Sequence, residues 1–99
     1  MKKKIVQTAG RESLGKFAPK FAHYNDDILF GEQWNDKSID TKTKCIITLT
    51  SLISQGIIDE SLKAHLNNAK IQGVTKEEIA SIIAHIGFYA GWPKAWGSI

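Results

Sequence analysis

The stretch HLNNAKIQGVTKEEIASIIAHIGFYAGW, residues 65–92, contains the end of one predicted helix, a turn and the whole of the next helix. Gly73 is a typical helix stop, and Thr75 with Glu78 three residues later is a capping box that begins a new helix. Isoleucines then recur at steps of three and four, which predicts a strongly apolar helix that ends at Gly91: Ile79, Ile82, Ile83 and Ile86.

The preceding residues follow the same helical pattern. Asp40 or Ser38 can cap a helix that runs to about Ser54, whose apolar stripe is Cys45, Ile46, Leu49, Leu52 and Ile53. Gly56 is a plausible stop, and Asp59 or its neighbours begin the helix that ends at Gly73. The buried side of that helix is predicted to consist of Leu62, Leu66 and Ala69.

The N-terminal part is predicted to be helical from Glu12 to Phe30, because apolar residues recur there at helical spacing. Pro19 interrupts the pattern, so the segment is either two short helices or one helix that restarts with Pro19 in its first turn. Residues 30–40, FGEQWNDKSID, have the composition of a turn. Residues 1–10 are predicted to be a loose N-terminal arm.

Length and composition predict one globular domain over residues 1–99. The net charge of +3 includes a terminal run of three lysines and only one arginine, which does not favour nucleic-acid binding. The single cysteine excludes an internal disulfide. We find neither a signal peptide nor an apolar run of about 20 residues, so we expect a cytoplasmic protein with no membrane segment.

The fold class follows from these patterns: all-α, with about five to six short-looped antiparallel helices. The isoleucine-rich helix is apolar on more than one side, and a chain of 99 residues has little interior in which to bury it. We therefore expect part of its surface to be covered by another subunit.

Histidines at helix edges are the first candidates for chemistry. His65 lies beside the row formed by Leu62 and Leu66, at the edge of the packed face. His85 has the same position on the isoleucine-rich helix, with Tyr89 one turn later. The alternative is that each histidine fills space and bonds to a neighbouring loop, and from position alone that is the more frequent case.

Acidic and aromatic residues add further candidates. Glu32 lies between Phe30 and Trp34, where partial desolvation would raise the pKa of its carboxyl and suit it to proton transfer; the alternative is a solvated loop acid. Trp92 is predicted to form a pocket wall or an interface anchor. There is no zinc-ligand spacing and no phosphate-binding glycine loop.

Taken together, ILFGEQW and HLNNAKIQGVTKEEIASIIAHIGFYAGWPKA resemble the carboxymuconolactone decarboxylase family, from about residue 20 to the C-terminus. The resemblance implies an all-helical, alkylhydroperoxidase-D-like fold that assembles into homotrimers or homohexamers. It also implies a cofactor-free lyase of bacterial aromatic catabolism, which removes CO2 from a carboxylated unsaturated lactone or related oxo-acid.

The resemblance assigns roles to the candidates. His65 would be the oxyanion donor or acid, and Glu32 the second proton-handling group. The pocket for the small carboxylate substrate would be lined by His85, Tyr89, Trp92 and Trp34. No metal is implied.

The sequence departs from the peroxidase members of this fold, whose activity depends on Cys-x-x-Cys with a histidine four residues after the second cysteine. Counting back from His65, those cysteines would fall at Ser61 and Ile58, and Cys45 is in another helix. A peroxiredoxin-type activity is therefore disfavoured. A non-catalytic oligomeric binding module on the same scaffold remains the other alternative.

Overall fold

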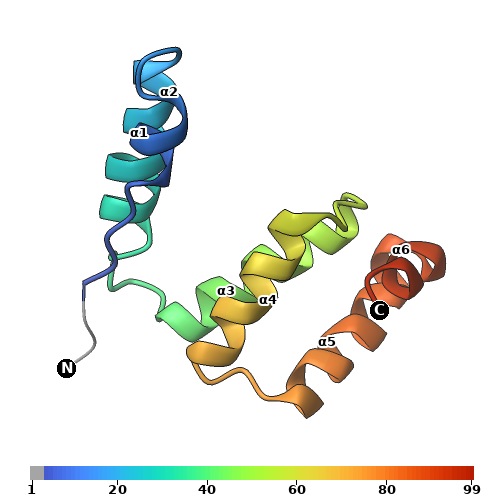
Figure 1. Cartoon of the computed structure of the whole chain (residues 1–99). Coiled ribbons are helices and arrows are strands. Elements are labelled where there is room, and N and C mark those ends of the chain that lie inside the picture. The colour runs from blue at the N-terminus through green and yellow to red at the C-terminus, as the bar shows by residue number, and fades with distance from the viewer. Residues whose placement is uncertain (1–3) are drawn as a thin grey trace. The chain divides into compact units, whose positions relative to one another are not determined.

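The computed structural model describes residues 4–99, and its regular structure over those residues is helical (Figure 1). This confirms the predicted all-α class. The chain divides into two compact units, one up to Asp40 and one from Thr41 to Ile99. We describe each unit by itself, and the expectation of a single domain stays a prediction.

The first unit contains α1 (Ala9–Leu14), α2 (Pro19–His23) and the π-helix η1 (Tyr24–Gln33), which continues α2 directly. Pro19 is in the first turn of α2, as predicted for a helix that restarts at that residue. The helix continues beyond Phe30, where a turn was predicted. The side-chain amide of Asn35 explains this extension, because it donates to the carbonyls of Phe30 and Gly31 at 3.1 and 3.0 Å and so satisfies the end of the helix.

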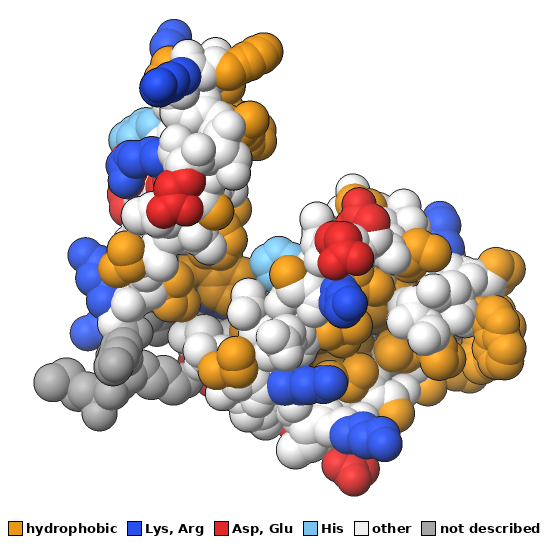
Figure 2. All heavy atoms as spheres, viewed as in Figure 1, with side chains coloured by type: hydrophobic (Ala, Val, Ile, Leu, Met, Phe, Trp, Pro, Cys, Tyr) orange, Lys and Arg blue, Asp and Glu red, His pale blue; other side chains and the backbone are white. Residues whose placement is uncertain are grey.

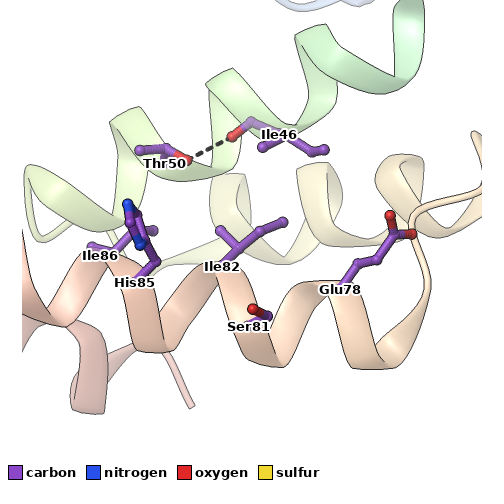
Figure 3. Close-up of a pocket in the computed structure, with 7 residues that line it drawn as sticks. All are labelled: Ile46, Thr50, Glu78, Ser81, Ile82, His85 and Ile86. Atoms are coloured by element: carbon purple, nitrogen blue, oxygen red, sulfur yellow. Dashed lines mark hydrogen bonds between the residues drawn. The ribbon is translucent and has the colours of Figure 1, made fainter.

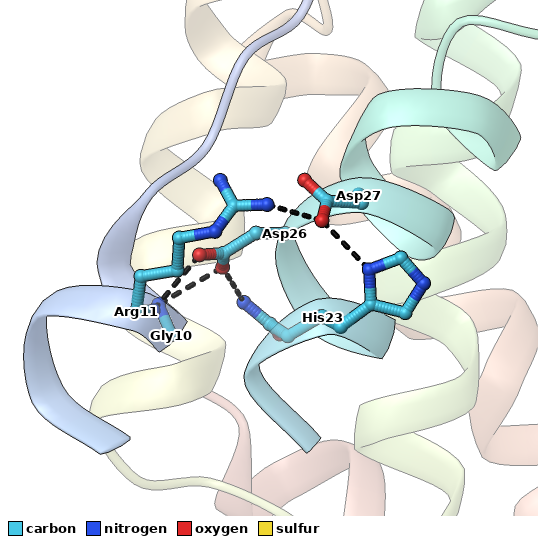
Figure 4. Close-up of polar contacts among 6 residues, drawn as sticks. Gly10, Arg11, His23, Asp26 and Asp27 are labelled. Carbon is cyan, nitrogen blue, oxygen red and sulfur yellow. Dashed lines mark hydrogen bonds and ion pairs between the residues drawn. The ribbon is translucent and has the colours of Figure 1, made fainter. Parts of the chain in front are cut away.

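The N-terminal arm is also shorter than predicted, because α1 begins at Ala9. Asp26, which is 2% exposed, accepts hydrogen bonds from the backbone N–H groups of Gly10 and Arg11 at 2.9 and 2.8 Å (Figure 4). A carboxylate of η1 therefore caps the first turn of α1. Ahead of α1, Ile5 exchanges two hydrogen bonds with the side chain of Asn35. Residues 1–3 of the predicted arm lie outside the described residues.

Around this contact the first unit holds a polar cluster. Arg11 and His23 both contact the carboxylate of Asp27, His23 at 2.7 Å (Figure 4). Their hydrogen bonds outweigh desolvation and lower the pKa of Asp27. Burial by itself would raise the pKa of Asp26, but hydrogen bonds from Asn25 and from the N-terminus of α1 reverse this and lower it.

The second unit contains α3 (Thr41–Ser54), α4 (Glu60–Ile71), α5 (Lys76–Ala90) and α6 (Trp92–Gly97). Their bounds agree with the sequence patterns. Asp59 caps α4 by accepting from the N–H of Ser61, and the predicted capping box of Thr75 and Glu78 begins α5. The stops at Gly56, Gly73 and Gly91 have positive φ angles of 77°, 95° and 104°, which favour glycine.

The core of the second unit forms where α3 meets α4 and α5. Figure 1 shows that α3 and α4 run antiparallel and that α5 runs in about the same direction as α3. The predicted stripes of α3 and α4 supply most of the buried side chains, which are Cys45, Leu49, Ile53, Leu62 and Ala69, together with Val74, Ile86 and Ala95. Leu49 and Ile53 are each 1% exposed. The isoleucine-rich helix α5 is less buried, and only Ile86 of its apolar residues is in this core.

Gly87 of α5 lies directly against the side chain of Trp92 in α6. A Cβ atom on Gly87 would lie 2.7 Å from Cε3 of Trp92 and 3.0 Å from Cζ3, closer than a normal carbon–carbon contact. The indole of Trp92 therefore packs against the bare backbone of α5. No helix within residues 4–99 has the length and apolar character needed to cross a membrane.

Candidate active site

A groove between α3 and α5 contains His85, one of the predicted site residues, and a hollow beside it also contains Tyr89. The groove has a volume of about 400 Å³, and the hollow, of about 310 Å³, shares His85, Ile86 and Thr50 with it. The groove is lined by Ile46, Thr50, Glu78, Ser81, Ile82, His85 and Ile86 (Figure 3). Ser54 and Tyr89 complete the hollow. The walls are mainly apolar, which is typical of small-molecule sites.

At one end of this site, His85 and Tyr89 lie together. Their ring centroids are 5.1 Å apart, as expected for side chains one helical turn apart. Figure 3 shows the imidazole of His85 projecting from α5 toward Thr50 of α3. The hydroxyl of Thr50 donates to the carbonyl of Ile46 at 2.8 Å, so its oxygen is available to the groove as an acceptor. This end can therefore hold a polar group of a ligand.

At the other end of the groove, the lining residue Glu78 forms an ion pair that the sequence analysis missed, with a lysine outside the lining. Lys42 of α3 lies 3.1 Å from Oε2 of Glu78. Oε1 of Glu78 accepts from the backbone N–H of Thr75, and these two contacts outweigh desolvation and lower the pKa of Glu78. The sequence signal for Glu78 was its place in the capping box, which explains one of its oxygens but gives no sign of Lys42.

His65 lies in α4 at the edge of the buried row, as its position predicted, and it is half-buried. Desolvation lowers the pKa of its imidazole below the ordinary value of 6.5, so the neutral ring predominates at neutral pH. A neutral imidazole has one N–H donor and one acceptor. His65 is therefore better suited to donate a hydrogen bond to an oxyanion than to act as a cationic acid. It is not among the residues that line the groove or the hollow.

Glu32 and Trp34 belong to the first unit. Glu32 lies within η1 and is exposed, so the partial desolvation predicted for a turn between aromatic residues is wrong for the chain as described. The aromatic rings stack on each other instead, because Phe30 and Trp34 have centroids 6.1 Å apart and planes only 9° from parallel. The proposed roles of Glu32 and Trp34 stay predictions.

Trp92 and Cys45 have different surroundings. Trp92 is 59% exposed and packs against Gly87, and it is not among the residues that line the groove or the hollow. Cys45 is 3% exposed in the core face of α3, where a thiol is protected from reaction. Its burial agrees with its place in the predicted apolar stripe of this helix.

Comparison with known proteins identifies a family that matches most of the chain. The sequence model described as "Carboxymuconolactone decarboxylase family" matches residues 19–99, which include α2, η1 and the whole second unit. The chain belongs to this family. The match leaves out α1 but includes Asp26, whose carboxylate caps α1. This cap therefore joins a matched residue to the unmatched helix.

Two similar proteins carry different descriptions. The chain is 33% identical over 84 residues to a 4-carboxymuconolactone decarboxylase of Acinetobacter baylyi, covering 85% of this chain and 62% of that protein. It is 28% identical over 101 residues to an uncharacterized 15.0 kDa protein of Paracoccus denitrificans, covering 86% of this chain and 75% of that protein. The chain thus spans about three fifths of the length of the first relative.

Proposed function

We propose that this protein is a cofactor-free, decarboxylase-like lyase that acts on a carboxylated unsaturated lactone or related oxo-acid. The family match and the similarity to a 4-carboxymuconolactone decarboxylase support a decarboxylase-like role. The structural observation that carries the proposal is a half-buried histidine, His65, whose pKa is lowered by desolvation. A neutral, partly desolvated N–H donor is suited to a developing oxyanion.

The chemistry needs little from the protein. When the bond between the ring and the carboxylate breaks, CO2 leaves and the electron pair moves into the ring, placing negative charge on the lactone carbonyl oxygen. In our proposal His65 donates its N–H to that oxygen. A proton from an acid then returns to a ring carbon and restores the lactone, so one proton is consumed for each CO2 released. From the family resemblance alone we assign Glu32 as the second proton-handling group, and substrate contacts to His85, Tyr89, Trp92 and Trp34.

Self-association is the second part of the proposal. Near the junction of α5 and α6 the aromatic side chains of Phe88, Tyr89 and Trp96 are 83%, 82% and 69% exposed, and Figure 2 shows hydrophobic side chains gathered over α6. An exposed aromatic surface of this kind is typical of interfaces. We propose a homotrimer or homohexamer, and light scattering coupled to size-exclusion chromatography would distinguish either from a monomer.

The direct test incubates the protein with a carboxylated butenolide in D2O and follows both CO2 and the ring by NMR. The proposal predicts CO2 release above the buffer rate with one deuterium incorporated into the ring. Equal CO2 release with and without protein would refute it. Replacement of Cys45 by alanine separates the peroxidase alternative, because peroxide reduction that requires the thiol would then be lost while CO2 release would remain.

A further inference from the structure

The hollow beside the groove is open on one side. Its lining residues come from two helices, with Thr50 and Ser54 on α3 and with His85, Ile86 and Tyr89 on α5. Ile86 is buried at 4% exposure, whereas His85 is exposed and Tyr89 is 82% exposed. Small-molecule sites usually bury about 70–90% of the surface of the ligand. A ligand beside His85 would therefore be covered only in part by the helices that line this hollow.

Tyr89 belongs both to this hollow and to an exposed aromatic surface of α5 and α6. We define the aromatic surface by four residues, which are Phe88, Tyr89, Trp92 and Trp96. The ring of Tyr89 lies 5.1 Å from that of His85, measured between their centroids. A protein surface that buries Tyr89 must therefore also approach His85 and the opening of the hollow. Covering the aromatic surface and closing the hollow are thus one event.

The size and composition of the aromatic surface favour a second copy of this chain as its partner. Its four residues are between 59% and 83% exposed, which corresponds to on the order of 600 Å². A standard interface covers about 800 Å² on each partner, so these residues alone supply most of one. Aromatic rings pack well against one another, so the surface is complementary to itself, as a symmetric interface requires. Lys94 is the single charged residue of α6, so two copies can meet there with little repulsion.

We propose that a second copy of this chain closes the hollow, and that Trp96 of that copy lies over His85 and Tyr89 as the missing wall. Trp96 is better placed for this role than Trp92, which packs against Gly87 of its own chain. The site at His85 is then complete only in the assembled protein. This inference rests on the self-association that is part of the proposed function. It adds that the same contact excludes water from the two proposed substrate contacts on α5.

The experiment measures how fast diethyl pyrocarbonate modifies each histidine of the full chain, with mass spectrometry to identify the modified residue. The reagent needs access to a neutral imidazole nitrogen. His85 should react several-fold more slowly when the chain is assembled than when it is diluted to the monomer, with the assembly state followed by analytical ultracentrifugation. His23 is exposed in the first unit and contacts Asp27 through Nδ1. It serves as the internal reference, and its reactivity should not change on assembly.

Two variants test the origin of the missing wall. Trp96 is 69% exposed and is not among the residues that line the hollow of its own chain, so its effect on His85 must come through another copy. Trp96→Ala should weaken association at least about tenfold, as for a central aromatic residue of an interface, and should raise the reactivity of His85 to that of the monomer. Ile71→Ala removes a side chain of similar exposure, 73%, at the end of α4 and should change neither quantity.

Equal reactivity of His85 in the assembled and the diluted protein would overturn the inference, as would a wild-type chain that stays monomeric at high concentration. An increase in His85 reactivity in Ile71→Ala as large as that in Trp96→Ala would also contradict it. Circular dichroism of each variant checks that helix content is retained, and the dilution of wild type gives the same comparison without any substitution. If assembly protects His85 but the protein releases no CO2 from a carboxylated butenolide, the inference holds and the lyase proposal alone is refuted.

Discussion

Replacement of Gly87 by alanine tests the packing that holds α6 against α5. The added Cβ would lie 2.7 Å and 3.0 Å from two ring atoms of Trp92, whereas carbon atoms normally approach to about 3.5–4.0 Å. The indole must therefore move by about 1 Å if the backbone stays in place. Overpacking of this kind costs about 1–3 kcal/mol, and we expect the low end because Trp92 is 59% exposed and can swing outward.

A second effect acts in the opposite direction. Alanine within a helix is about 1 kcal/mol more favourable than glycine. The two effects nearly cancel, so Gly87→Ala alone should change the free energy of unfolding little. In a Trp92→Ala background the clash is gone, and the same substitution should stabilise the protein by about 1 kcal/mol.

The assay is urea unfolding of the four proteins that form this double-mutant cycle, with helix content as the signal. The account predicts a coupling free energy of about 1 kcal/mol or more between positions 87 and 92. If Gly87→Ala stabilises both backgrounds equally, then the indole does not pack against Gly87 in solution and the described junction is wrong. The slope of the unfolding free energy against urea concentration should be the same in all four proteins. In that case the substitutions change the stability and not the surface exposed on unfolding.

Three further predictions concern the capped helices and the half-buried histidine. Gly10→Ala would place a Cβ 2.6 Å from Oδ1 of Asp26, so hydrogen exchange should accelerate at the N–H of Arg11 while α3 is unaffected. Thr75→Ala should lower the urea-derived stability by about 1 kcal/mol through loss of the N-cap of α5, and an unchanged value would argue against the capping box. Because the pKa of His65 is lowered on folding, the stability that it contributes is present above its ordinary pKa of 6.5 and is lost as pH falls below that value. An NMR titration midpoint above 6.5 would contradict this pH dependence of the stability.

The second unit could be predicted closely because its signals are local. Asp59, Thr75 and the three stop glycines determine helix ends through their own backbone conformation and hydrogen bonds, which sequence spacing records directly. The buried stripes of α3 and α4 follow from helical periodicity in the same way.

The first unit was harder to predict because its signals are long-range. The beginning of α1 depends on Asp26, 16 residues after Gly10, and Asn35, which follows η1, bonds to Ile5, 30 residues earlier. Neither contact has a fixed sequence spacing. Desolvation of Glu32 was inferred from aromatic neighbours in the sequence, but on η1 those rings stack on each other and leave the carboxyl exposed.

The site was predicted in part for the same reason. His85 and Tyr89 are one turn apart on one helix, so their proximity could be read from the sequence. The pairing of Lys42 with Glu78 joins two helices that are separated by α4, and nothing in the spacing of these residues indicates it. Tertiary contacts of this kind need the fold before they can be identified.

The central claim is that a neutral imidazole at position 65 stabilises the oxyanion formed when CO2 leaves, and the most direct test compares steady-state CO2 release by three proteins. Relative to wild type, His65→Ala should lower kcat at least about tenfold, equivalent to about 1.4 kcal/mol of barrier, whereas His85→Gln should mainly raise KM. If His65→Ala releases CO2 at the wild-type kcat, the imidazole takes no part in the reaction and the proposed mechanism is contradicted.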